Sequence, residues 1–374
     1  MLSKKINKFS KNKTVLVVPL DWGLGHATRC IPIIKELVIN GCNVVIAAEN
    51  NLHTLLKHEF QQLTFIPVPG YHVRYSKQTY WLPFKILIQI PKIIYRIYQE
   101  HRWLQKVVKR YAFNGVISDN RFGLFHRDVP CIYLTHQLLI KTGNRITEGF
   151  AQKLHYHFIR KYAECWVPDF AGKENMAGEL SHPAEMPENV RYIGSLSRLD
   201  ASKSRERKGF LLILLSGPEP QRSIFERLIL KQLESYKEPL TFIRGLPGLA
   251  EGDEKALSVL SNLPSNIKIK NHLPSLELNQ AILQADWVIA RSGYTTIMDL
   301  LKLKQKAILV PTPGQTEQEY LAAHLMEKQL FFCVKQDTFN LQTALEQAKQ
   351  FPYAEPSFDM ELYKKAIQRF VESI

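Results

Sequence analysis

Short apolar runs rich in β-branched residues alternate with longer segments of helical periodicity along this chain. In the first half the runs cover residues 13–21, 42–49, 115–119, 130–136, 163–169 and 190–194, and a helical pattern from Ala27 to Asn40 separates the first two. The runs are almost continuously apolar, as in strands that helices cover on both faces. Because the connections are short, the pattern predicts βαβ units and a parallel sheet.

The same alternation begins again after a polar stretch. Residues 196–209 contain few large apolar and many charged residues, which predicts a linker. Apolar runs follow at 210–217, 240–245, 266–273, 285–293 and 306–311, and 359–374 has the pattern of a terminal amphipathic helix. We therefore predict an α/β protein with two Rossmann-like, doubly wound domains that face a central cleft. These are residues 1–195 and 210–358, with the terminal helix packed back on the amino-terminal domain.

Charge is divided unevenly between the two halves. The net charge is +14, and residues 1–200 hold 27 Lys and Arg against 15 Asp and Glu, whereas residues 201–374 hold 22 against 20. This asymmetry indicates an anionic partner for the first half, either a membrane surface or a nucleic acid. No RNA-binding sequence pattern is present, so we expect no nucleic acid. The five cysteines form no C-x-x-C pair, which argues against a zinc site and for a reducing compartment.

A glycine-rich loop follows the first predicted strand. Gly23 and Gly25 allow a tight turn, and the free amides of a helix start favour an anion. His26 stands at this junction, where an imidazole can act as a general base. Asp119, which ends the run 115–119, could orient His26 as the third group of a triad does, or it could only cap the next helix.

Three further loops follow apolar runs in the second half. They are 216–223, 291–299 and 311–325, and the second places Ser292 at a helix start with Asp299 about two turns in. Ser292 could be only a helix cap and Asp299 only a solvated charge. A diphosphate at the helix start with a carboxylate on the ribose hydroxyls is the functional interpretation.

The segment RSGYTTIMDLLKLKQKAILVPTPGQTEQEYLAAHL (291–325) resembles the nucleotide-binding region of GT-B glycosyltransferases of the MurG and diacylglycerol-galactosyltransferase group. That group shows R-S-G, an acidic ribose ligand, a strand ending in Pro and a Gln pair, of which Glu319 replaces the second Gln. The resemblance implies a UDP-sugar-dependent enzyme with catalytic His26 and Asp119. The implied donor-binding residues are Ser216, Gly217, Gln221, His272, Arg291, Ser292, Gly293, Thr295, Asp299, Gln318 and Glu319, and the acceptor-side residues are Gly25, Arg29, His136 and Gln137.

Two alternatives remain open. The string from Gly23 to Arg29 is also similar to the sugar-nucleotide hydrolase of pseudaminic acid synthesis, which gives the sugar to water. A non-catalytic GT-B module that binds a nucleotide sugar or a lipid is the second. No D-x-D motif occurs in the chain, so we expect no metal and no cofactor beyond the UDP-sugar substrate.

The segment 71–112 combines basic and large apolar residues. It carries nine Lys and Arg against one Glu, interleaved with aromatic and aliphatic side chains. One interpretation is a crossover helix with a solvated basic face. The other is a helix in a membrane interface, with contacts from Trp81, Leu82, Phe84, Lys85, Lys92 and Arg96. We expect an inverting glycosyltransferase, peripheral on the cytoplasmic face of the membrane, that moves a sugar such as an N-acetylhexosamine to a lipid-linked or membrane-associated hydroxyl.

Overall fold

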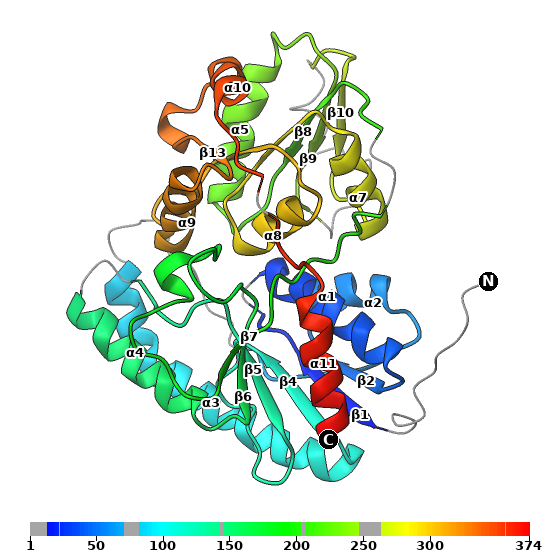
Figure 1. Cartoon of the computed structure of the whole chain (residues 1–374), viewed down its shortest axis with the longest axis vertical. Coiled ribbons are helices and arrows are strands. Elements are labelled where there is room, and N and C mark those ends of the chain that lie inside the picture. The colour runs from blue at the N-terminus through cyan, green and yellow to red at the C-terminus, as the bar shows by residue number, and fades with distance from the viewer. Residues whose placement is uncertain are drawn as a thin grey trace. The chain divides into compact units, whose positions relative to one another are not determined.

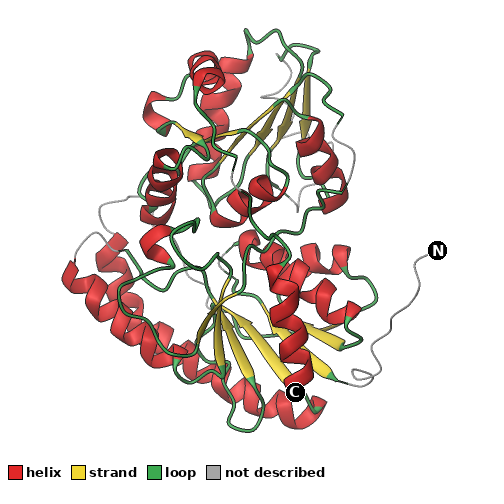
Figure 2. Ribbon diagram, in the orientation of Figure 1, coloured by secondary structure: helices red, strands yellow, loops and turns green. Residues whose placement is uncertain are grey.

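The computed structural model describes residues 13–21, 23–70, 82–141, 145–202, 206–246, 263–355 and 357–374. The chain divides into two compact units, Met1–Ser197 together with Asp359–Ile374, and Arg198–Phe358. Each unit is a parallel sheet with helices on its faces (Figure 2). The boundary lies inside the segment 196–209. The side chain of Asn279 bonds both the backbone N–H and the carbonyl of Asp200, so the segment after Ser197 begins within the second unit.

The sheet of the first unit has seven parallel strands in the order β3-β2-β1-β4-β5-β6-β7. The strands are β1 (Thr14–Val18), β2 (Asn43–Ala47), β3 (Thr64–Ile66), β4 (Gly115–Asp119), β5 (Cys131–Leu134), β6 (Glu164–Val167) and β7 (Val190–Tyr192). Strand β1 lies between β2 and β4, with Val18 paired to Ser118. The loops that follow these central strands therefore begin at the same edge of the sheet.

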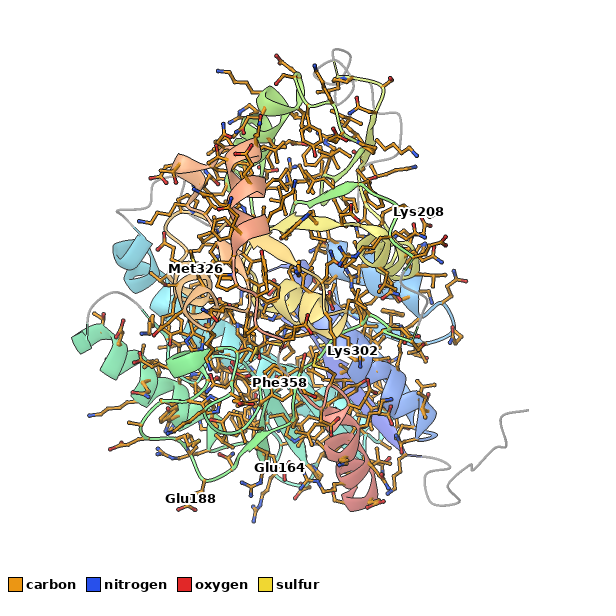
Figure 3. The ribbon with its side chains drawn as sticks, turned by 45° about the horizontal axis from the view of Figure 1, so that its top comes forward. Glu164, Glu188, Lys208, Lys302, Met326 and Phe358 are labelled. Carbon is orange, nitrogen blue, oxygen red and sulfur yellow. The ribbon has the colours of Figure 1, made fainter. Side chains whose placement is uncertain are left out.

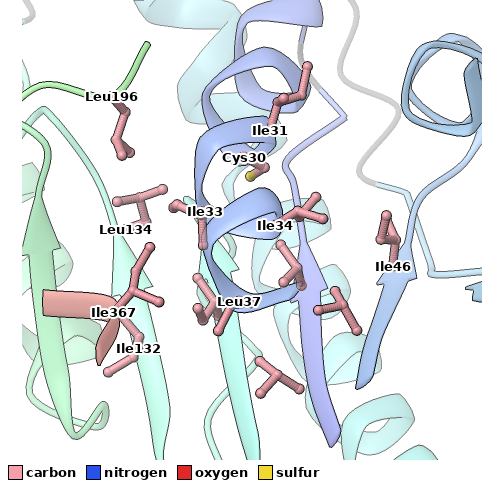
Figure 4. Close-up of a cluster of buried hydrophobic side chains, with 14 of the residues drawn as sticks. Cys30, Ile31, Ile33, Ile34, Leu37, Ile46, Ile132, Leu134, Leu196 and Ile367 are labelled. Atoms are coloured by element: carbon pink, nitrogen blue, oxygen red, sulfur yellow. The ribbon is translucent and has the colours of Figure 1, made fainter. Parts of the chain in front are cut away.

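Helices cover both faces of this sheet because successive strand residues point to opposite sides. Val15 and Val17 pack with α1 (Leu24–Ile39), α2 (Asn50–Glu59) and α11 (Leu362–Ser373) in one core, part of which Figure 4 shows. Leu16 and Val18 pack with α3 (Leu82–Tyr111) and α4 (Arg145–Ile159) in the other.

Helix α11, at the end of the chain, lies beside α1 (Figure 1). It approaches β4 so closely that a Cβ atom at Gly115 would lie 2.5 Å from the ring of Phe370. The last segment of the chain is therefore part of the amino-terminal unit.

The second unit has six parallel strands in the order β10-β9-β8-β11-β12-β13. They are β8 (Leu211–Leu214), β9 (Leu240–Ile243), β10 (Ile267–Lys270), β11 (Trp287–Ala290), β12 (Ala307–Leu309) and β13 (Phe332–Cys333). The helices are α5 (Gln221–Leu233), α7 (Ser275–Gln284), α8 (Tyr294–Lys302), α9 (Thr316–Glu327) and α10 (Leu341–Gln350). Apolar residues of α5 and α10 pack on one face of the sheet.

The predicted fold class is confirmed, and each predicted apolar run contains a strand. Two short strands, β3 and β13, were not predicted. Helix α1 begins at Leu24, earlier than the pattern indicated, so His26 lies in its first turn.

The segment 71–112 contains the long helix α3. Its residues Ile97, Glu100 and Leu104 are buried at helical spacing, whereas Ile94, Tyr95 and Tyr98 are about half exposed. None of the helices in the described part of the chain is both long and apolar enough to cross a bilayer.

Candidate active site

Polar side chains of the first unit meet where three neighbouring strands end. His26 follows β1 in the first turn of α1, Asp119 is the last residue of β4, and His136 comes two residues after β5. Parallel strands deliver their carboxyl ends to one edge of a sheet, and that edge is where ligands bind in folds of this type. The fold thus brings together residues that are about a hundred positions apart in the sequence.

The His26 imidazole and the Asp119 carboxylate are in direct contact. Nδ1 of His26 lies 2.8 Å from Oδ2 of Asp119, which is fully buried, while 17% of the His26 side chain is exposed. The described residues include no hydrogen-bond partner for Nε2 of His26. This is the arrangement of a general base whose second nitrogen is held by a carboxylate.

Arg29 occupies the centre of the same cluster. Its Nε and Nη2 lie 2.7 Å and 2.5 Å from Oδ1 of Asp119, and its Nη1 lies 2.7 Å from Nδ1 of His136. The guanidinium is almost completely buried. Arg29 and His136 were predicted as acceptor-side residues. In the structure Arg29 contacts both Asp119 and His26, and His136 joins them through its contact with Arg29.

Of the two other predicted acceptor-side residues, Gly25 lies in the first turn of α1 and Gln137 lies in the loop after β5. The carbonyl of Gly25 accepts a hydrogen bond from the Thr28 hydroxyl, and the backbone N–H of Gln137 donates to the Thr135 hydroxyl.

Burial and charge act in opposite directions on this cluster. Burial on its own raises the pKa of Asp119, but Arg29 and His26 outweigh it, so the pKa of this carboxyl is below its ordinary value. Burial lowers the pKa of His26 and the Arg29 cation lowers it further, while Asp119 raises it, and the net pKa is below 6.5. The structure therefore favours an ionised Asp119 beside a neutral His26.

In the second unit, glycines border open space at two helix starts. Gly217 follows β8 shortly before α5 with φ of 107°, and Gly293 is the N-cap of α8. A Cβ atom at either position would meet nothing within 4 Å. Backbone N–H groups at a helix start can bind a diphosphate. Ser216 precedes Gly217, whereas the Ser292 hydroxyl is buried and donates to the carbonyl of Gln318.

Asp299 lies on α8, which ends at Lys302 (labelled in Figure 3), and is paired with a residue that the sequence did not single out. Nε of Arg198 is 3.8 Å from Oδ2 of Asp299, and both side chains are largely buried. Nη1 of Arg198 also donates to the Ser275 hydroxyl. Arg198 thus contributes a cation beside the predicted ribose ligand.

Arg291 was predicted to bind the donor, but its guanidinium lies inside the unit. It donates to the carbonyls of Val310, Pro311 and Gln221 and to the side chain of Gln336. The guanidinium carbon also lies 4.1 Å from the centroid of the Phe225 ring. Burial lowers the pKa of Arg291 to about 10. The structure therefore makes Arg291 a residue that ties the loop after β12 to the start of α5 and to Gln336.

The two predicted donor-sugar residues on α9 also hold their own loop. Oε1 of Gln318 accepts from the backbone N–H of Thr312 at 3.0 Å, and its Nε2 donates to Gln315. Oε1 of Glu319 accepts from the backbone N–H of Gly314 at 2.9 Å. The loop before α9 is thus preorganised by the residues expected to contact the sugar.

Buried charge at the start of α5 is a further feature that the sequence did not reveal. Glu226 accepts from both Arg222 and Arg244, and Arg222 also bonds the more exposed Glu219. Nearby, Oε1 of Gln221 and the hydroxyl of Thr312 are buried without a hydrogen-bond partner among the described residues. An unsatisfied buried polar group costs about 1–3 kcal/mol, and a polar ligand group that reached either atom would offset that cost.

The remaining predicted residues are placed as follows. His272 lies after β10, and Thr295 lies in the first turn of α8. Lys92 and Arg96 lie on α3. Leu82, Phe84 and Lys85 belong to the first turn of α3, and Trp81 lies outside the described residues. No three His, Cys, Asp or Glu side chains within the described ranges are grouped to hold a metal ion.

Comparisons with known sequences find similarity to glycosyltransferases. The family model described as the glycosyltransferase family 28 C-terminal domain matches residues 229–371. A UDP-N-acetylglucosamine–N-acetylmuramyl-(pentapeptide) pyrophosphoryl-undecaprenol N-acetylglucosamine transferase of Rickettsia felis is 23% identical over 61% of this chain and 63% of its own length. An uncharacterized glycosyltransferase of Methanosarcina mazei is 21% identical over 82% of this chain and 81% of its own.

Solved structures show the same fold. The glycotransferase of kitacinnamycin aligns with a TM-score of 0.62 at 14% identity, over 97% of this chain and 95% of that one. Acinetobacter baumannii MurG aligns with a TM-score of 0.52 at 18% identity, over 97% and 99%. At these identities the likeness shows the GT-B fold alone.

The protein therefore has the fold of the GT-B class of glycosyltransferases. Within that class it resembles the MurG group, through the family 28 domain of its carboxy-terminal part and its Rickettsia relative.

Proposed function

We propose that this protein is a glycosyltransferase that moves an N-acetylhexosamine from a UDP-sugar to a hydroxyl group of a lipid-linked or membrane-associated acceptor, with inversion at the anomeric carbon and without a metal ion. The observation that carries the proposal is the contact of His26 with Asp119 at 2.8 Å, with Nε2 of the imidazole left for the acceptor. The donor is inferred from the similarity to the Rickettsia relative, which is a UDP-N-acetylglucosamine-dependent transferase by name.

His26 and Asp119 divide the proton chemistry in this proposal. The neutral His26 accepts the acceptor hydroxyl proton at Nε2 as the acceptor oxygen attacks the anomeric carbon. The bond between that carbon and the diphosphate oxygen breaks, and UDP leaves with the electron pair. Asp119 accepts from Nδ1–H and stabilises the imidazolium that forms.

The second unit supplies donor binding. The helix starts at Gly217 and Gly293 leave room for a diphosphate, and the Asp299 carboxylate can accept from ribose hydroxyls. Amide groups at these helix starts take up the charge of the leaving diphosphate, which supports a reaction without a metal.

Membrane association is supported by helix α3. Ile94, Tyr95 and Tyr98 are exposed on one side of it, and the guanidinium of Arg102 lies 5.7 Å from the Tyr98 ring centroid. Apolar and aromatic side chains with a basic rim suit the interface of an anionic bilayer. This surface gives the enzyme a route to a lipid-linked acceptor on the cytoplasmic face of the membrane.

A panel of nucleotide sugars in a thermal-shift assay tests the donor. A ligand at 100 times its Kd stabilises a protein by about 2.7 kcal/mol. We expect UDP and UDP-N-acetylhexosamines to bind more tightly than GDP or dTDP compounds and therefore to raise the melting temperature more. EDTA leaves the shift unchanged. A shift with dTDP compounds alone would overturn the choice of UDP, and loss of the shift in EDTA would overturn the metal-free mechanism.

A sugar-nucleotide hydrolase is the second candidate, because the string from Gly23 to Arg29 is shared with that activity and the structure places its His26 and Arg29 together. Product analysis without an acceptor separates the two. A hydrolase releases free sugar at its full rate, whereas a transferase releases UDP slowly until acceptor is added.

A further inference from the structure

One carboxylate, Asp119, faces two groups that can carry positive charge. Oδ1 is occupied by Nε and Nη2 of Arg29, and Oδ2 by Nδ1 of His26. The Asp119 side chain is fully buried and that of Arg29 almost so. An arginine remains protonated at any working pH, so Arg29 and Asp119 already form a neutral pair.

We propose that Arg29, rather than His26, is the cation that balances Asp119, and that this pair fixes His26 as the neutral tautomer with its proton on Nδ1 and its lone pair on Nε2. This inference rests on the proposed role of His26 and assigns Arg29 as a positioning residue that acts through it.

The tautomer follows from the contacts of Nδ1. This atom lies 2.7 Å from Nη2 of Arg29 as well as 2.8 Å from Oδ2 of Asp119. Nδ1 cannot accept from Arg29 and donate to Asp119 at once. Nη2 has a closer, charged acceptor in Oδ1 of Asp119, at 2.5 Å, and charge-assisted hydrogen bonds are the stronger ones. Nδ1–H therefore donates to Oδ2, and Nε2 keeps the lone pair that a general base needs.

The remaining groups around His26 reinforce the neutral state. His136, after β5, accepts from Nη1 of Arg29 and adds no negative charge. Cys30, which follows Arg29 on α1, stays a thiol because burial raises its pKa well above the ordinary value. Asp21, after β1, lies 3.6 Å from Nη2 of Arg121, whose Nη1 also donates to Glu100, and the charges that shift the pKa of His26 are those of Arg29, Asp119 and His136 instead. Protonation of His26 would thus add a net positive charge to a buried, already neutral cluster.

The consequence is a base that remains available at mildly acidic pH. Burial and Arg29 lower the pKa of His26, so its neutral fraction persists below the range of an ordinary histidine. Without Arg29, the negative charge of Asp119 would be balanced by no other cation in the cluster, so it would raise the pKa of His26 and favour the imidazolium.

Nitrogen-15 NMR of His26 in the unliganded wild-type protein tests this directly. We expect a protonated Nδ1 and an unprotonated Nε2 at pH 8, and a titration midpoint below 6.5. A midpoint above 6.5, or a proton on Nε2, would overturn the proposal. This readout needs no substrate, so it stands even if the proposed donor or acceptor is wrong.

Variants of Arg29 extend the test to catalysis. In Arg29→Met the His26 midpoint moves to higher pH, and kcat/KM at pH 5.5 relative to pH 8 falls about tenfold, as expected when an adjacent charge is removed. Arg29→Lys retains the cation and the wild-type pH profile. Equal loss of activity at all pH values in both variants, with an unmoved midpoint, would mean that Arg29 is only structural.

Discussion

Asp299 provides the sharpest test of donor binding in the carboxy-terminal unit. Its carboxylate lies on α8, about 3.8 Å from the Arg198 guanidinium by the nearest atoms, and is largely buried. We expect Asp299→Ala to remove hydrogen bonds between a charged group and the ribose, which contribute about 1.5–3 kcal/mol. That loss corresponds to a Kd for UDP that is roughly 10- to 150-fold higher.

Isothermal titration calorimetry with UDP measures this loss. Glu277→Ala, on the exposed side of the first turn of α7, is the matched control and leaves the Kd unchanged. The Arg198 partner sets a second expectation. If Asp299 only neutralised Arg198, the double variant Asp299→Ala, Arg198→Met would recover wild-type affinity. Unchanged affinity in the single variant, or full recovery in the double one, would refute the role of Asp299 as ribose ligand.

Three further predictions concern the first unit. His26→Ala lowers turnover roughly 100-fold or more with little change in Kd for UDP, as for a general base, and wild-type turnover would make His26 structural. The wild-type protein sediments with anionic vesicles, and the replacement of Ile94, Tyr95 and Tyr98 by serine removes the binding that persists at high salt. A wild-type protein that stays in the supernatant at low salt would favour a soluble acceptor. Burial lowers the pKa of His155 to about 4. The stability that neutral His155 provides is complete above pH 6.5 and is lost as the pH falls toward 4, by about 2 kcal/mol between pH 7 and pH 5. We expect urea denaturation to show a smaller difference in the free energy of unfolding between pH 7 and pH 5 in His155→Gln, but not in the exposed control His157→Gln. Equal pH dependence in both variants would contradict the role of His155.

The fold could be predicted because buried parallel strands have a strong sequence signal. Strands β1 and β8 are covered on both faces and are therefore almost continuously apolar. Strands β3 and β13 lie at sheet edges and have three and two residues, too few to show a pattern. Strand ends that converge at one sheet edge also made the contact of His26 with Asp119 predictable.

The internal contacts of the site residues could not be predicted, because they depend on which partners the fold supplies. Arg29 follows His26 by three positions, and the sequence does not show that it turns inward onto Asp119. Arg291 fits the resemblance, yet the nearby carbonyls and Gln336 take its guanidinium. Arg198 lies in a polar segment expected to be a linker, and only the structure brings it to Asp299.

The fate of the sugar tests the proposed transfer from a UDP-sugar to a membrane acceptor most directly. The enzyme is incubated with UDP-N-acetylglucosamine labelled in the sugar, with vesicles that contain a polyprenyl-diphosphate-linked sugar or without them. We predict that the label moves to the lipid fraction in β-linkage, with an equal amount of UDP released, only when the lipid acceptor is present. Label released as free sugar at the same rate with and without acceptor would contradict the proposed transfer to a lipid acceptor.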